Sequence, residues 1–203
     1  MIQIIDYGMG NLRSVQKALQ HVGAEAEVVR NPAELNESHK LILPGVGAVR
    51  DAMAHLNDAG WTEPIVNHVR SGRPLLGICL GMQLLFDASD EGGDVPCLGL
   101  LKGRVVRFNV SDPAIKVPHM GWNGLSVARP DCPLLNGLED GCEVYFVHSY
   151  FAMPTDQNII VATTDHGGEF CAVVQQDNLL ATQFHPEKSQ ANGLKMLENF
   201  AKL

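Results

Sequence analysis

The sequence carries little positive charge and has no apolar run long enough to cross a membrane. Its 203 residues include 15 Lys and Arg against 23 Asp and Glu, a formal net charge of −8. Nucleic-acid binding needs clustered Lys and Arg to neutralise phosphates, so an acidic chain is a poor candidate for it. A membrane-spanning helix needs about 20 apolar residues, far more than runs such as 98–101 offer. We therefore expect neither a nucleic-acid partner nor a membrane partner.

Cysteine is scarce and shows no pairing pattern. The five cysteines are an odd number and include no Cys-x-x-Cys pair. Their spacing disfavours a disulfide framework and a zinc site, and it favours a reducing, cytoplasmic location. Residues 1–6 lack the basic start of a signal peptide. The sequence also has no His-Glu-x-x-His motif, so we expect no metal and no cofactor.

Short apolar runs alternate with amphipathic stretches in the first half of the chain. The expected strands are 2–5, 26–30, 40–43 and 74–79, and the expected helices are 11–21, 50–59, 63–71 and one that begins at 82–86. This alternation is typical of βαβ units and predicts an α/β fold with a mainly parallel central sheet flanked by helices.

The second half has a different pattern. The expected strands are 103–110, 124–128, 143–150, 159–164, 172–175 and 179–184, with a short closing helix around Leu197. Strands with few helices between them predict antiparallel additions to the sheet. No linker divides the chain, so we expect residues 1–203 to form one domain.

The strongest local signal is Gly77-Ile78-Cys79-Leu80-Gly81, between an apolar strand and an apolar helix. This is the strand–turn–helix setting of a nucleophile elbow, Gly-x-Ser-x-Gly, with Cys in place of Ser. The tight turn needs glycine on both sides, because flanking side chains would clash. The first N–H groups of the helix, including that of Leu80, would face an oxyanion at the sulfur. The alternative is a buried core cysteine, which is our interpretation of the other four.

A cysteine nucleophile needs a base and a group that orients the base. His185 follows directly after an expected strand, and active-site groups of α/β sheets gather at the carboxyl ends of strands. Pro186 allows the chain to turn, so that Glu187 can reach the imidazole of His185. The pattern does not show that His185 lies near Cys79.

Two motifs, Gly77–Gln83 and Phe184–Glu187, together resemble those of the class I, triad-type glutamine amidotransferases. Other segments narrow the resemblance to the glutaminase subunits of imidazole glycerol phosphate synthases: 6–12, 43–48, 119–123 and 145–150. The resemblance spans nearly the whole chain. It implies the class I glutamine amidotransferase fold and a heterodimer that acts in histidine biosynthesis.

The resemblance implies a glutaminase with a Cys-His-Glu triad. Cys79 attacks the side-chain amide carbon of glutamine, His185 protonates the departing ammonia, and Glu187 orients His185. Water then hydrolyses the glutamyl thioester, and glutamate leaves.

The resemblance also assigns the remaining groups of the site. The N–H of Leu80 and a peptide N–H at Val46–Gly47 would hold the oxyanion, the latter after a peptide flip driven by the partner's ligand. Glycine allows such a rotation at little steric cost, although an ordinary strand-end turn is the alternative. Gln83 would contact the substrate, and its amino-acid end would be lined by His148, Ser149 and Tyr150.

The implied partner is a (βα)₈-barrel cyclase subunit that receives ammonia through a tunnel. It would make imidazole glycerol phosphate and an aminoimidazole carboxamide ribonucleotide. We expect four residues near that interface: His119, Trp122, Asn123 and Tyr145. The alternative for these is core packing, above all for Trp122.

Other functions remain open at this point. The chain could feed ammonia to the synthesis of pyridoxal phosphate, anthranilate or guanylate. A cysteine peptidase or γ-glutamyl hydrolase would instead cleave peptides. A binding subunit without chemistry is disfavoured because Cys79, His185 and Glu187 are all present.

Overall fold

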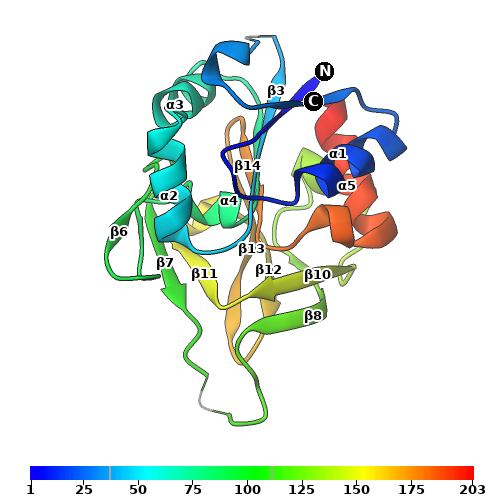
Figure 1. Cartoon of the computed structure of the whole chain (residues 1–203). Coiled ribbons are helices and arrows are strands. Elements are labelled where there is room, and N and C mark those ends of the chain that lie inside the picture. The colour runs from blue at the N-terminus through cyan, green and yellow to red at the C-terminus, as the bar shows by residue number, and fades with distance from the viewer. Residues whose placement is uncertain (37, 111) are drawn as a thin grey trace.

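The computed structural model describes residues 1–36, 38–110 and 112–203. Its centre is an eight-stranded sheet with the strand order β2-β1-β3-β4-β14-β13-β12-β9 (Figure 1). The parallel strands are β1 (Ile2–Ile5), β2 (Ala26–Val29), β3 (Lys40–Gly45), β4 (Leu75–Cys79) and β14 (Leu179–Thr182). The antiparallel additions are β13 (Glu169–Gln176), β12 (Ile160–Asp165) and β9 (Ser126–Val127). The predicted parallel sheet with antiparallel additions is confirmed.

Helices cover both faces of this sheet (Figure 1). One face carries α1 (Leu12–His21) and α5 (Gln190–Lys202), and the other carries α2 (Val49–Asp58) and α3 (Thr62–Arg70). In α1 the buried residues recur at helical spacing, as in Val15, Ala18 and Leu19, which gives the helix one apolar side. Each pair of helices thus closes a separate hydrophobic core against its face of the sheet.

Two smaller sheets accompany the central one in the part of the chain that the structure describes. The first pairs β8 (His119–Gly124) with β10 (Glu143–His148), and the second has the order β11-β7-β5-β6. Its strands are β5 (Ala88–Ser89), β6 (Val95–Pro96), β7 (Gly103–Arg107) and β11 (Tyr150–Pro154). The expected single strand 143–150 is therefore wrong. His148 pairs with His119 in one sheet, whereas Tyr150 pairs with Arg107 in the other, so the strand divides at Ser149.

The helix expected to begin at 82–86 is also different. It is α4 (Leu80–Gln83), which begins earlier and has only four residues. The carbonyls of Leu84, Leu85 and Phe86 accept hydrogen bonds from N–H groups of residues 98–101. These carbonyls are therefore not available to accept the N–H groups of a further helical turn, and the helix ends early.

Within the described residues, four short 3₁₀ helices complete the fold. They are η1 (Pro32–Glu34), η2 (Pro133–Leu135), η3 (Gln157–Ile159) and η4 (Pro186–Lys188). In the part of the chain that the structure describes, no helix has the length and hydropathy needed to cross a membrane.

Candidate active site

Cys79 lies at the sharp turn where β4 ends and α4 begins. Its φ of 55° and ψ of −108° are unusual for a residue with a side chain, and such a conformation costs about 1–3 kcal/mol. A Cβ on Gly81 would lie 1.8 Å from the carbonyl oxygen of Leu43, and one on Gly77 would lie 2.9 Å from Cδ1 of Leu85. The turn therefore requires glycine on both sides of the cysteine, which is the geometry of a nucleophile elbow.

The strand order brings His185 to this turn. In the central sheet β4 lies between β3 and β14, and Thr182 is the partner of Ile78. The chain that leaves β14 therefore passes beside Cys79. The backbone N–H of His185 donates to the carbonyl oxygen of Tyr145 at 3.1 Å, which fixes the chain there.

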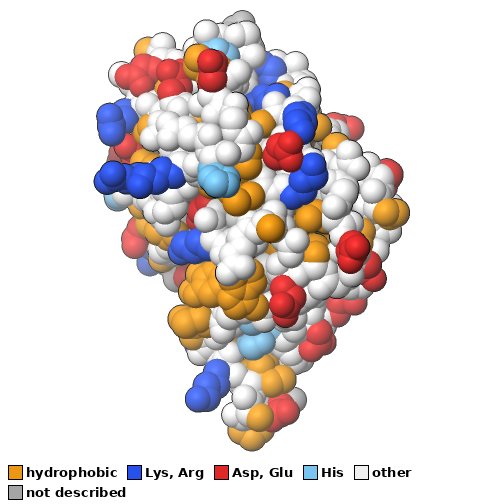
Figure 2. All heavy atoms as spheres, turned by 90° about the vertical axis from the view of Figure 1, so that its right-hand side faces the viewer, with side chains coloured by type: hydrophobic (Ala, Val, Ile, Leu, Met, Phe, Trp, Pro, Cys, Tyr) orange, Lys and Arg blue, Asp and Glu red, His pale blue; other side chains and the backbone are white. Residues whose placement is uncertain are grey.

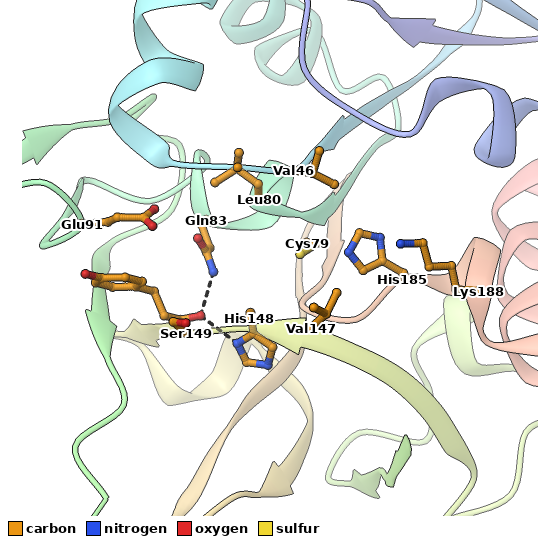
Figure 3. A pocket seen from close by; sticks show the side chains of 12 residues that line it. Val46, Cys79, Leu80, Gln83, Glu91, Val147, His148, Ser149, His185 and Lys188 are labelled. Carbon is orange, nitrogen blue, oxygen red and sulfur yellow. Dashed lines mark hydrogen bonds between the residues drawn. The ribbon is translucent and has the colours of Figure 1, made fainter. Parts of the chain in front are cut away.

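The imidazole of His185 lies between a carboxylate and the thiol. Its Nδ1 is 2.8 Å from Oε1 of Glu187, and the two side chains are only 2% and 1% exposed. Figure 3 shows the sulfur of Cys79 directed toward the imidazole ring. Burial lowers the pKa of His185, but hydrogen bonds and charge interactions with Cys79 and Glu187 outweigh it and raise the pKa to about 9. This arrangement favours a protonated imidazolium beside the sulfur at physiological pH.

The turn η4 places the carboxylate. Pro186 begins η4, and the N–H of Lys188 donates to the carbonyl of His185 at 3.0 Å. The hydroxyl of Ser189 donates to the same carbonyl at 2.7 Å. The backbone is therefore held so that Glu187 folds back onto the imidazole.

The other four thiols have a different environment. Burial raises the pKa of each, to about 12 for Cys97 and Cys171. All five cysteines are free. The structure therefore keeps Cys97, Cys132, Cys142 and Cys171 in the protonated, less nucleophilic form.

Cys79 and His185 line a cavity of about 230 Å³. The other residues that line it are Val46, Gly47, Leu80, Gln83, Glu91, Val147, His148, Ser149, Tyr150 and Lys188 (Figure 3). All the residues expected at the oxyanion and the substrate are thus brought to one cavity. Gly47 has a φ of +99°, a conformation that favours glycine.

The imidazole of His148 is hydrogen-bonded within the protein and is not free to contact the substrate through a ring nitrogen. Its Nδ1 lies 2.8 Å from the carbonyl oxygen of Tyr150, and its Nε2 lies 3.3 Å from Nδ1 of His119. Burial lowers the pKa of His148 to about 3. The ring is therefore neutral at physiological pH, and both nitrogens already have protein partners.

The four residues expected near the interface do not share one environment. Trp122 is 45% exposed, so core packing is wrong for it, and its ring lies 6.0 Å from that of half-buried Tyr145. His119 is buried and stacks on Phe146, so its side chain belongs to the core. The side-chain NH₂ group of half-buried Asn123 is hydrogen-bonded to His119 and to the carbonyl oxygen of Asp165.

Glu91 and Lys188 also line the cavity, although no sequence motif pointed to them. Glu91 Oε2 accepts a 2.9 Å hydrogen bond from the N–H of Val49 at the start of α2, which holds its carboxylate at the cavity. No local pattern marks a loop acid whose position depends on a distant helix. Lys188 directly follows Glu187, and this adjacency to an expected triad residue is the sequence signal that could have identified it.

The chain matches known proteins over nearly its full length. The family described as glutamine amidotransferase class-I matches residues 3–203. Two curated relatives carry the name imidazole glycerol phosphate synthase subunit HisH. The protein from Syntrophotalea carbinolica is 54% identical, covering 98% of this chain and 98% of its own length. The one from Geobacter sulfurreducens is 53% identical, covering 100% of this chain and 98% of its own.

A solved structure agrees at the level of the fold. The structure of PurLQS from Thermotoga maritima superposes with a TM-score of 0.77 at 23% identity. The match covers 99% of this chain and 97% of that one.

Proposed function

The chain belongs to the class I glutamine amidotransferase family, and from this premise we propose that it is the glutaminase subunit of an imidazole glycerol phosphate synthase in histidine biosynthesis. The observation that carries the proposal is that Cys79 and His185 line one cavity while Glu187 is hydrogen-bonded to His185. Relatives that bear this subunit's name match 98% and 100% of the chain. We also propose that residues 1–203 form one glutamine amidotransferase domain located in the cytoplasm, where five free thiols stay reduced.

The triad hydrolyses glutamine in two steps. The Cys79 thiolate adds to the side-chain amide carbon of glutamine, and the imidazolium of His185 delivers its proton to the leaving nitrogen. The C–N bond breaks, ammonia leaves and a glutamyl thioester remains. His185 then takes a proton from water, which attacks the thioester and releases glutamate and the thiol. Glu187 keeps the imidazole in one orientation throughout.

The oxyanion of each tetrahedral intermediate needs two donors. We assign them to the N–H of Leu80, in the first turn of α4, and to a peptide N–H at Val46–Gly47. The second donor becomes available after a peptide flip for which Gly47 supplies the freedom. Because one oxyanion donor is worth about 10²–10³ in rate, this flip gates the activity.

The polar ends of the cavity suit an amino acid. The carboxylate of Glu91 is available for the α-ammonium group of glutamine, because only its Oε2 is engaged by Val49. Gln83, Ser149 and Tyr150 also line the cavity. A γ-glutamyl peptide carries the same α-ammonium group, so this contact does not distinguish a glutaminase from a γ-glutamyl hydrolase. The two differ in the substrate that is cleaved.

Exposed apolar side chains at the cavity (Val46) and on β8 (Met120 and Trp122) support a protein partner. Val46, Met120 and Trp122 are 40%, 63% and 45% exposed, although all three are large hydrophobic side chains. Figure 2 shows hydrophobic side chains gathered on the face that carries β8 and β10. Exposed apolar patches of this kind mark interaction sites. We propose that this face binds a (βα)₈-barrel cyclase subunit as a heterodimer, and that ammonia passes between them.

A glutaminase assay with and without the cyclase and its nucleotide ligand tests the proposal. We expect little glutamate from the chain alone and a large increase in the complex. Cys79→Ala should abolish glutamine-dependent synthesis, while added ammonia still supports the cyclase. High activity without the partner would refute the gating, and cleavage of γ-glutamyl peptides in preference to glutamine would favour the hydrolase.

A further inference from the structure

A buried amide lies against the nucleophile and has no place in the triad. Gln183 is fully buried, and its Nε2 is 3.8 Å from the sulfur of Cys79. Its Oε1 accepts a 3.1 Å hydrogen bond from Nε2 of Gln83. One end of this amide therefore faces the thiol and the other is held by a second amide.

A backbone carbonyl fixes the orientation of both amides. Nε2 of Gln83 also donates to the carbonyl oxygen of Tyr150 at 2.8 Å. A carbonyl only accepts, so Gln83 must present its NH₂ group there. The same NH₂ group of Gln83 also needs an acceptor in Gln183, so it is the side-chain oxygen of Gln183 that faces Gln83. The NH₂ group of Gln183 therefore faces the sulfur.

The same carbonyl begins a second series of hydrogen bonds. Nδ1 of His148 must donate to Tyr150 O, so its Nε2 is an acceptor for Nδ1–H of His119 at 3.3 Å. Nε2 of His119 then accepts from Nδ2 of Asn123 at 3.3 Å. Asn123 Nδ2 also donates to the carbonyl oxygen of Asp165 at 2.7 Å, so a backbone acceptor fixes this end too.

The two series form one continuous chain from β8 to the sulfur, and every donor and acceptor in it is determined. We propose that Gln183 is a catalytic residue that donates a hydrogen bond to the Cys79 thiolate, and that Asn123, acting through His119 and His148, positions it. The inference rests on the proposed function for the role of Cys79. Because Asn123 is next to exposed Trp122, a partner seated on β8 would act on the thiolate through this chain.

The test measures the alkylation of Cys79 by iodoacetamide in the isolated chain, followed by mass spectrometry of the Cys79 peptide. Gln183→Met removes the donor at nearly constant volume. We expect about a tenfold lower rate at pH 7 and a pH midpoint shifted upward, since hydrogen bonds to ionised groups are commonly worth that factor or more. The other titratable groups that interact with the sulfur, Tyr7 and His185, are unchanged. Gln175→Met, on the neighbouring strand β13, is the matched control and should leave the rate unchanged.

A double-mutant cycle tests the positioning role. Asn123→Asp keeps the shape but cannot donate to His119, and we expect at least a twofold lower rate. In the Gln183→Met background it should have no further effect. Asn192→Asp removes a comparable donor to the carbonyl of Glu143 and adds the same charge, so it should have no effect.

Each outcome decides a separate point. An unchanged rate in Gln183→Met overturns the catalytic role, and equal effects of Asn123→Asp in both backgrounds overturn the positioning. If Gln183→Met does not fold, Gln183→Glu keeps the shape and must slow alkylation at pH 7. If Cys79 is not the fastest-reacting cysteine in the unmodified chain, the proposed function itself fails.

Discussion

Alanine at Gly81 tests whether backbone packing sets the nucleophile's position. The added Cβ would lie 1.8 Å from the carbonyl oxygen of Leu43 and 2.9 Å from its carbonyl carbon. Leu43 lies within β3, so rotating a side chain cannot relieve the contact. Gly81 does not have a positive φ, and alanine is therefore acceptable to its backbone. The clash accounts for the whole cost.

The expected magnitude follows from this geometry. Extra methyl groups in packed sites cost about 1–3 kcal/mol, and a backbone obstacle at this distance places Gly81→Ala at about 3 kcal/mol. For a chain of this size that lowers the melting temperature by about 6–12 °C. Relief requires β3 and α4 to separate, which moves the N–H of Leu80. We therefore expect kcat/KM for glutamine to fall about 10²-fold in the complex.

A graded series provides the control. Gly77 and Gly124 also lack a positive φ. Added Cβ atoms there would lie no closer than 2.9 Å and 3.2 Å to the nearest atoms. Thermal melts should rank the loss of stability as Gly81→Ala, then Gly77→Ala, then Gly124→Ala. A Gly81→Ala variant with the same melting temperature as the unsubstituted protein, or a reversed ranking, would refute the steric argument.

Three further predictions concern single side chains. The pKa of His185 is raised from 6.5 to about 9, so the contribution of the imidazolium to folding stability is complete below pH 6.5 and is lost as the pH rises through about 9. Thermal melts across this range should show the melting temperature decline, and Glu187→Gln should make that decline smaller. The hydroxyl of Tyr7 is buried without a hydrogen-bond partner among the described residues, so Tyr7→Phe should raise the melting temperature by a few degrees, about 1 kcal/mol, and a lower value would show a hidden partner. Trp122→Ala should weaken cyclase binding at least tenfold by calorimetry with no loss of stability, whereas unchanged affinity would place the interface elsewhere.

The sequence predicts those parts of the fold that depend on local pattern. Strands β1 to β4 and helices α1 to α3 lie within one or two residues of their expected ranges, because apolar spacing and turn residues define them locally. The division of 143–150 into β10 and β11 depends on partners elsewhere in the chain. The short α4 depends likewise on acceptance of N–H groups from residues 98–101. Neither contact can be predicted from the local sequence.

The site divides in the same way. Glycines around Cys79 and the turn after His185 are local requirements, so the sequence alone singles out those residues. Their meeting depends on the insertion of β14 beside β4, which sequence spacing does not reveal. Glu91 and Gln183 reach the cavity and the sulfur through contacts that the fold alone supplies.

Two close backbone contacts hold the two halves of the triad, and both require glycine. Gly81 packs against the carbonyl of Leu43, which fixes the turn that carries Cys79. Gly193 in α5 packs against η4, where a Cβ would lie 1.9 Å from the carbonyl oxygen of Pro186. This second contact fixes the turn that carries Glu187. The positions of nucleophile and carboxylate therefore follow from two separate backbone contacts, and the hydrogen bond between His185 and Glu187 forms within a turn that packing already holds.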